Sequence, residues 1–227
     1  MHSRPIARLV ALTLAAVLTA TLTACARGES PLLVPAPAAL AAPAPDSFVV
    51  RFETTRGPFD LLVRRHWSPN GADRLHYLAR HGFYDGVRFF RVVPGFVAQF
   101  GLSGDTAVAA AWRERTIPDD TVRASNRRGT VAFARGGPET RTTQLFVNLK
   151  DNPRLDELNG FGFPPVGEVV SGMETVVDSL YQGYGEGPPR GMGPSQDSIR
   201  VLGTPYLERE FPELDWVRRA SVVKEWK

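Results

Sequence analysis

One arginine in the middle of an otherwise apolar segment is the residue of this chain whose chemistry most needs an explanation. Residues 89–93 are apolar and partly β-branched apart from Arg91, and the turn-forming pair Pro94-Gly95 follows them. An arginine is costly to bury without partners, so Arg91 is expected to open onto a groove and to find hydrogen-bond acceptors there. The alternative is an edge-strand arginine that reaches out to solvent. Phe96 and Gln99 add an aromatic ring and an amide close to the cation.

A second segment downstream favours the groove. The sequence predicts a strand at residues 130–134, a Gly-Gly-Pro loop, and another strand at residues 143–149. Side chains alternate between the two faces of a strand, so Gln144 and Phe146 share one face and the apolar residues on either side of Phe146 share the other. The second strand is therefore expected to present an apolar row to the core and an amide beside an aromatic ring to the groove.

Together the two segments resemble the cyclophilin family of peptidyl-prolyl cis-trans isomerases. The family's signature is an F-x-R-V-x-P-x-F-x-x-Q run followed by G-x-x-x-x-A, GP-x-T and S-Q-F-F, and residues 89–99 and 129–146 meet it almost position for position. The resemblance covers about residues 47 to 223. It implies a mainly β fold, namely a closed eight-stranded antiparallel barrel capped by two helices. It also implies an isomerase of proline-containing polypeptides that uses no cofactor and no metal.

The resemblance implies a role for each matching residue. Arg91 matches the catalytic arginine, whose planar fork can donate to the amide of a twisted Xaa–Pro bond. Gln99 matches the glutamine that orients this arginine and contacts the substrate backbone. The remaining matches bind substrate: the proline pocket at Phe96, Phe146 and Leu155, its edge at Phe133, and the peptide main chain before the proline at Ala134, Arg135 and Gln144.

Three positions depart from the family's pattern. Arg135 stands where the family has an asparagine, although its backbone is expected to make the usual substrate contacts. Arg154 stands where eukaryotic members have a tryptophan. The family's histidine at the end of this loop aligns most naturally with Phe163, which we therefore expect to line the substrate site. The changes at Arg154 and Phe163 are expected to weaken cyclosporin binding more than catalysis.

The N-terminus predicts export and lipid attachment. Arg4 and Arg8 form a basic region, and residues 9–24 form an apolar stretch that is short for a membrane span. The stretch ends in Leu-Thr-Ala followed by Cys25, the single cysteine, which resembles a bacterial lipobox. We thus expect a signal peptide at residues 1–24, a lipid on Cys25, and a protein anchored to the membrane at the cell envelope, facing the periplasm or the exterior. The alternative is an ordinary secretory signal with a chance cysteine.

The rest of the chain is predicted to be a tether followed by one globular domain. Residues 25–46 are rich in Ala and Pro, and as a polyproline-like tether they would reach roughly 60 Å. The domain occupies residues 47–227. Within it the sequence predicts a helix from Pro69 to Gly82, a helix over residues 173–181, a short helix over residues 198–209, and a last strand at 216–223 that pairs with the first strand at 48–52.

Charge and motifs exclude several other functions. The 227-residue chain carries a formal charge of +3, and two of these charges lie in the signal peptide, so no nucleic-acid partner is expected. The histidines show no spacing typical of a metal site. The leading prediction is a monomeric prolyl isomerase that assists folding outside the cytoplasm. The alternatives are a proline-peptide-binding chaperone with little turnover, or an envelope scaffold that uses the loop at residues 185–215. If this loop binds no partner, we expect it to be a structural brace across the end of the barrel.

Overall fold

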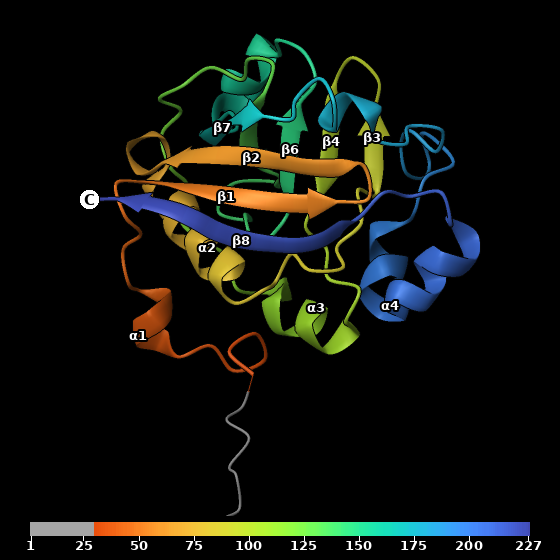
Figure 1. Cartoon of the computed structure of the whole chain (residues 1–227), viewed down its shortest axis with the longest axis horizontal. Coiled ribbons are helices and arrows are strands. Elements are labelled where there is room, and N and C mark those ends of the chain that lie inside the picture. The colour runs from red at the N-terminus through yellow and green to blue at the C-terminus, as the bar shows by residue number, and fades with distance from the viewer. Residues whose placement is uncertain (1–29) are drawn as a thin grey trace, which may run out of the picture.

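The computed structural model describes residues 30–227, so the signal peptide and Cys25 lie outside the described residues. Within these residues eight strands form one sheet, and helices cover parts of it (Figure 1). The elements in chain order are α1 (Pro37–Leu40), β1 (Ser47–Thr54), β2 (Gly57–Arg64), η1 (Arg65–Trp67), α2 (Pro69–Arg80), β3 (Arg91–Val93), β4 (Val97–Phe100), α3 (Thr106–Arg113), β5 (Thr130–Phe133), β6 (Leu145–Asn148), η2 (Pro153–Asp156), η3 (Leu158–Gly160), β7 (Pro165–Ser171), η4 (Val177–Ser179), α4 (Gln196–Glu210) and β8 (Val217–Trp226).

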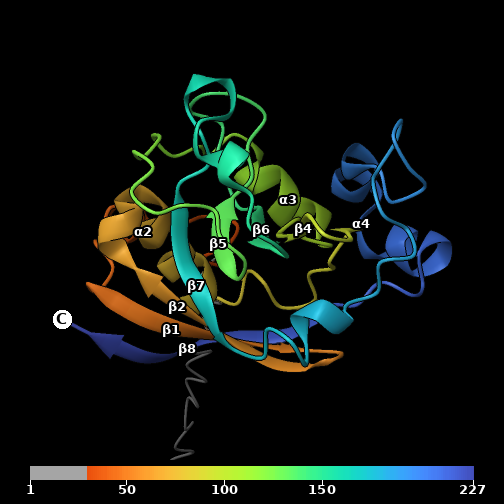
Figure 2. The same cartoon turned by 90° about the horizontal axis from the view of Figure 1, so that it is seen from above.

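The strands form one antiparallel sheet in the order β3-β4-β6-β5-β7-β2-β1-β8. The sheet curls round, as the view from above shows (Figure 2), and β8 meets the segment that leads into β3. There, an isolated bridge joins Arg88 to Trp216, and three backbone hydrogen bonds connect residues 86–89 to residues 215–217: the amides of Gly86 and Phe89 donate to the carbonyls of Val217 (2.7 Å) and Asp215 (2.9 Å), and the Val217 amide donates to the Val87 carbonyl (2.9 Å). The expected eight-stranded barrel is confirmed, but its closure is incomplete, because β3 is too short to pair along β8.

The inside of the curled sheet holds the main hydrophobic core. Alternate residues of β1 are buried, so Phe48, Val50 and Phe52 point inward, as the period-two pattern requires. Phe52 stacks on Phe59 at 4.9 Å between ring centroids and meets Phe100 edge-on at 5.6 Å. The predicted helix from Pro69 is confirmed as α2, and its buried face packs into this core.

The expected helix at residues 173–181 is absent from the structure. Only Val177–Ser179 form a 3₁₀ turn, although Met173, Val176, Val177 and Leu180 are all buried as the pattern required. The Ser179 hydroxyl donates to the carbonyls of Thr175 and Val176, which competes with a regular helical ladder. The spacing of apolar residues thus identified the buried side chains correctly and the backbone conformation wrongly.

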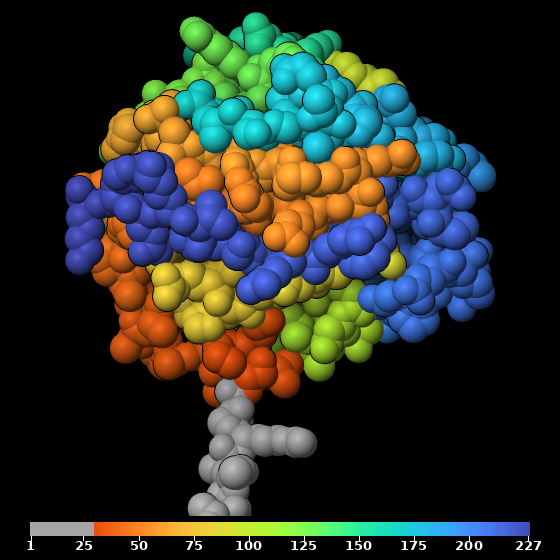
Figure 3. Space-filling model, viewed as in Figure 1, coloured from red at the N-terminus to blue at the C-terminus, as the bar shows by residue number. Residues whose placement is uncertain are grey.

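Residues 30–46 do not form the extended tether that the sequence predicted. They include the helix α1, and they lie against α2 and α3, where the space-filling view shows them covering that end of the domain (Figure 3). Trp112 Nε1 donates to the Leu32 carbonyl (2.8 Å), and the Tyr77 hydroxyl donates to the Pro31 carbonyl (2.9 Å). This part of the segment is therefore an integral cover of the domain.

The segment after β7 forms its own small core beside β3. The short helix predicted at residues 198–209 is confirmed as α4, which bends at Gly203, where φ is 63°. Ile199 and Leu207 of this helix pack on Phe90 and Leu102 of the barrel. The last strand, β8, pairs with β1 as predicted. Within residues 30–227, no helix has the length and apolar character to cross a membrane.

Candidate functional site

Arg91 and Gln99 face each other across the β3–β4 hairpin. The two residues are register partners, and Arg91 Nη1 donates to Gln99 Oε1 over 3.0 Å. Gly95 takes a φ of 62° in the connecting turn, a conformation that glycine adopts without strain. The Arg91 guanidinium lies 5.5 Å from the centroid of Phe96. The structure therefore brings together the cation, the amide and the aromatic ring that the sequence singled out.

A row of amides continues from Arg91 across the floor of the groove. Gln99 Nε2 donates to Gln144 Oε1 (2.9 Å), and Gln144 Nε2 donates to Gln196 Oε1 (3.2 Å). β4 supplies Gln99, the residue just before β6 supplies Gln144, and α4 supplies Gln196. Gln99 is almost completely buried, so its partners fix its orientation.

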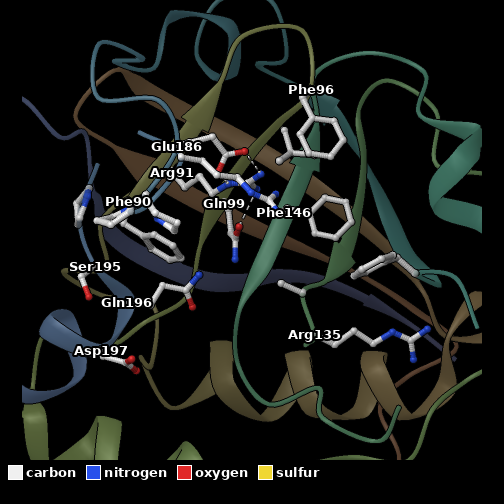
Figure 4. Close-up of a pocket in the computed structure, with 18 of the residues that line it drawn as sticks. Phe90, Arg91, Phe96, Gln99, Arg135, Phe146, Glu186, Ser195, Gln196 and Asp197 are labelled. Atoms are coloured by element: carbon white, nitrogen blue, oxygen red, sulfur yellow. Dashed lines mark hydrogen bonds and ion pairs between the residues drawn. The ribbon is translucent and has the colours of Figure 1, made fainter. Parts of the chain in front are cut away.

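An apolar pocket lies beside Arg91. Phe146 and Phe163 meet edge-on at 5.6 Å, and Leu155 and Val97 complete a cluster that is separate from the main core. Phe96 is packed against the same cluster. The cavity bounded by these residues, by Arg91 and by the segment after β7 has a volume of about 780 Å³ (Figure 4). It is large enough for a proline ring and its neighbours and is open to solvent on one side.

A smaller hollow of about 390 Å³ adjoins this cavity. The two share Gln99, Ala134, Arg135, Gln196 and Arg200 as lining residues, so together they form one continuous groove. Gln144 lies in the wall of the smaller hollow, where the main chain of a bound peptide is expected. Its placement agrees with the prediction from the strand alternation.

Phe133 is the predicted site residue that the structure does not bring to the groove. Its side chain is fully buried in the main core, on the opposite face of β5 from Ala132 and Ala134. Alternation along the strand explains this correction: if Ala134 faces the groove, its neighbour Phe133 must face the core. Phe133 is therefore a core residue rather than an edge of the proline pocket.

Arg135 turns its side chain away from the groove and supports the pocket wall from behind (Figure 4). The guanidinium lies 4.1 Å from the ring centroid of Phe161 and 5.4 Å from that of Phe163. It donates to the Phe161 carbonyl (2.6 Å) and pairs with Asp119 (2.5 Å). Burial lowers the pKa of Arg135, and the neighbouring Asp119 opposes this shift. Arg135 also lines both parts of the groove.

The acidic pair Asp119-Asp120 anchors a loop behind the site. Both carboxylates pair with Arg141, a fully buried side chain, and Asp120 also accepts hydrogen bonds from Ser68 and from backbone amides at the start of α2. Asp119 continues the network to Arg135. The loop carrying these two residues is thereby fixed between α2 and the pocket wall.

Asp156 holds the loop that carries Leu155 and Phe163. Its carboxylate accepts from the Ser125 hydroxyl (2.5 Å) and from the backbone and side-chain nitrogens of Asn126 (both 2.8 Å). Burial raises the pKa of Asp156, but these hydrogen bonds outweigh burial, so the net pKa is lowered. The same Asn126 side chain donates to the Phe163 carbonyl, so Asn126 links the segment of Leu155 and Asp156 to Phe163.

Glu186 is the functional residue that the sequence did not reveal. Its two carboxylate oxygens accept hydrogen bonds from Arg91 Nε (2.7 Å) and Nη2 (2.6 Å). The hydrogen bond with Arg91 lowers the pKa of Glu186, against the effect of burial. No local pattern could have pointed to it, because it lies in a Gly- and Pro-rich loop far from Arg91 in the chain. In the described part of the chain, no group of three His, Cys, Asp or Glu residues is arranged to hold a metal ion.

The fold and the site together define a curled β-barrel protein with a solvent-open groove beside a fixed arginine. A sequence model of the family described as cyclophilin type peptidyl-prolyl cis-trans isomerase matches residues 49–197. The match covers more than half of the chain, so the protein belongs to this family and is a peptidyl-prolyl cis-trans isomerase.

Relatives agree with this assignment, and solved structures share the fold. The chain is 34% identical over 137 residues to peptidyl-prolyl cis-trans isomerase A of Dickeya dadantii, covering 59% of this chain and 70% of that protein. It is 32% identical over 137 residues to peptidyl-prolyl cis-trans isomerase B of Escherichia coli, covering 58% and 83%. A Cryptosporidium parvum cyclophilin shares the fold, with a TM-score of 0.57 at 16% identity over 79% of this chain and 99% of that one. The cyclophilin AquaCyp293 of Hirschia baltica does so with a TM-score of 0.56 at 18% identity, covering 80% and 76%.

Proposed function

We propose that Arg91 catalyses rotation about Xaa–Pro bonds of polypeptides whose proline ring enters the pocket of Phe96, Phe146, Leu155 and Phe163. The observation that carries this proposal is the guanidinium held at the mouth of that pocket. Rotation is slow because amide resonance imposes a barrier of roughly 18–20 kcal/mol. In the twisted state the proline nitrogen regains its lone pair, and a cationic donor stabilises it there.

The arginine supplies only part of the required stabilisation. A 10⁵-fold acceleration needs about 7 kcal/mol, whereas one charge-assisted hydrogen bond contributes about 1.5–3 kcal/mol. The pocket supplies the remainder by gripping the ring while the preceding residue turns, and by excluding water from part of the bond. The amide row of Gln99 and Gln144 holds the peptide main chain in the adjoining hollow.

Isomerisation of a short Xaa–Pro peptide by the purified protein tests this proposal. Line-shape or exchange NMR measures the rate directly, without a coupling protease. Arg91→Ala is expected to lower kcat/KM by about ten- to a hundredfold, as the loss of one such bond implies. Arg154→Ala is the matched control, because Arg154 is exposed on the neighbouring turn. Peptide binding without acceleration by the wild type would instead support the alternative of a binding module.

We further propose that this activity serves proteins outside the cytoplasm and that a lipid on Cys25 anchors the monomeric enzyme to the membrane. The basic and apolar N-terminal residues, ending in Leu-Thr-Ala before Cys25, support this proposal. Metabolic labelling with a palmitate analogue tests it: the label is expected on the wild type and is lost in Cys25→Ser. Label on both forms, or on neither, would contradict lipidation at this residue. Sedimentation of the protein in detergent measures its oligomeric state, and the mass of a single chain is expected.

A further inference from the structure

The ion pair between Arg91 and Glu186 is a contact in the groove that the family's signature does not include. Both carboxylate oxygens take part, at 2.7 and 2.6 Å, so the pair is bidentate. The side chains are 19% and 29% exposed, respectively, which shields the pair from solvent. A bidentate pair of this kind fixes the plane of the guanidinium as well as its position.

Glu186 approaches Arg91 from the side away from the aromatic pocket. In the close-up view the carboxylate lies on one side of the guanidinium, Phe96 and Phe146 lie on the other, and Gln99 lies below (Figure 4). Arg91 Nε and Nη2 each donate one hydrogen bond to Glu186, and Nη1 donates one to Gln99. Further N–H groups on the terminal nitrogens remain available for a substrate. The contact thus restrains the arginine without consuming all of its donors.

The segment that carries Glu186 is itself held to the groove at a second point. Gln196, at the start of α4, accepts from Gln144 at the far end of the amide row (3.2 Å) and from Arg200 (3.4 Å). The apolar contacts of α4 with Phe90 keep this segment against the barrel. Near Glu186 itself, the Gly193 amide donates to the Glu186 carbonyl over 2.8 Å. The glutamate is therefore carried by a segment that contacts the barrel at several points beside the groove.

We propose that Glu186 is a positioning residue of the isomerase site, and that the segment from Glu186 to Arg200 completes that site as a second wall. This inference rests on the proposed role of Arg91. Without Glu186, Gln99 alone would orient the guanidinium, which could then rotate about its long flexible stem. Because catalysis depends on the placement of a donor within a fraction of an ångström, loss of this restraint lowers the rate.

The charge state of Glu186 provides a readout that a purely structural role would not move. Hydrogen bonding to Arg91 lowers its pKa, so the carboxylate is ionised at neutral pH and accepts two hydrogen bonds. Arg190 on the same segment acts in the same direction, and Asp197 and Arg200 of α4 line the same cavity. As the pH falls through the pKa of Glu186, one oxygen gains a proton and loses its acceptor role, so kcat/KM of the wild type falls. In Glu186→Gln this acid limb disappears.

A double-mutant cycle tests the proposal with the full-length protein and a short Xaa–Pro peptide. Glu186→Gln is expected to lower kcat/KM roughly tenfold in the wild-type background and to have almost no effect when Arg91 is already alanine. Glu186→Asp keeps the charge on a shorter side chain, so its kcat/KM is expected to lie between that of the wild type and that of Glu186→Gln. The matched control is Glu174→Gln, since the Glu174 side chain is 80% exposed, does not line the groove and pairs with Arg128 at 3.7 Å.

The outcomes separate this inference from the function on which it rests. If Arg91→Ala itself leaves the rate unchanged, the proposed catalytic role fails. If Arg91→Ala is slow but Glu186→Gln is as fast as the wild type, or faster, Glu186 does not position the arginine and the inference is wrong. Equal fold-losses in both backgrounds would also overturn it, because they would show that Glu186 acts independently of Arg91. Far-UV circular dichroism and urea midpoints verify that each variant is folded.

Discussion

Removal of the Arg135 side chain is expected to destabilise the protein while leaving every residue of the amide row in place. In Arg135→Ala the guanidinium no longer stacks on Phe161, at 4.1 Å, or donates to its carbonyl, at 2.6 Å. Asp119, only 18% exposed, loses its closest partner and retains Arg141 at 3.3 Å. Phe163 also loses the support behind its ring.

The size of the effect follows from these contacts. A hydrogen bond to a charged group contributes about 1.5–3 kcal/mol, and a cation–π contact that is shielded from water contributes up to about 2 kcal/mol. Because Asp119 keeps one arginine partner, the full cost of about 3–5 kcal/mol for stranding a buried charge does not apply. We therefore expect a loss of about 3 kcal/mol in the free energy of unfolding. Arg135→Lys keeps the charge but not the flat stacking face, so it is expected to recover only part of this loss.

Urea unfolding followed by tryptophan fluorescence measures the change. With a slope of about 1–3 kcal/mol per molar urea, the midpoint of Arg135→Ala is expected about 1–3 M below that of the wild type. The exposed Arg154, replaced by alanine, is the control and is expected to stay within about 0.5 kcal/mol. A midpoint for Arg135→Ala that coincides with the control would refute the reasoning, because the stacked guanidinium would then contribute nothing to stability.

Three further predictions concern the groove and its support. Phe146→Ala enlarges the proline pocket, so peptide isomerisation assays are expected to show kcat/KM lowered by about ten- to a hundredfold, with the larger part in KM. Gln99→Ala frees Arg91 Nη1, so kcat is expected to fall about tenfold; an unchanged kcat would show that the amide row does not orient the arginine. Asp156→Asn removes the charge and one acceptor; its remaining oxygen can serve the two Asn126 donors, so the bond accepted from the Ser125 hydroxyl is lost, and the change is expected to cost about 1–3 kcal/mol in urea unfolding at pH 7.

The Asp156 prediction has a definite pH dependence. Its pKa is lower in the folded protein than the ordinary value, so the folded state binds the proton more weakly than the unfolded state does. The resulting stability is fully present above the ordinary pKa of an aspartate and is lost as the pH falls through the folded value. The difference between the wild type and Asp156→Asn in urea midpoint is therefore expected to shrink from pH 7 to about pH 3. A difference that grows on acidification would contradict the assignment.

Local patterns predicted what local physics determines. The helix from Pro69, the strand alternation of Gln144 and Phe146, and the pairing of the last strand with the first are all confirmed. The helix α3 was not predicted, although Asp105 caps it and an alanine-rich run follows. Its start is marked by a single aspartate, and aspartate is common both at helix N-caps and in turns.

Contacts between distant segments could not be predicted in the same way. Glu186 reaches Arg91 only because α4 packs beside β3, and no periodicity in its loop encodes that packing. The direction of the Arg135 side chain likewise depends on Asp119 and Phe161, which the fold brings together from separate loops. The apolar spacing at residues 173–181 specified burial but not the hydrogen bonding of the backbone. Tertiary packing determined each of these features.

The pairing of β1 with β8 has a consequence for how the enzyme becomes active. Ser47 pairs with Trp226, so the first and last strands of the domain must meet before the sheet is complete. Contacts between residues so far apart in the chain slow folding, because a long loop must close before they form. Part of the groove wall also comes from the last third of the chain, at Glu186 and Gln196. A chain emerging from its N-terminus would therefore gain isomerase activity only after its C-terminal strand is available, so this folding catalyst cannot assist the early steps of its own folding.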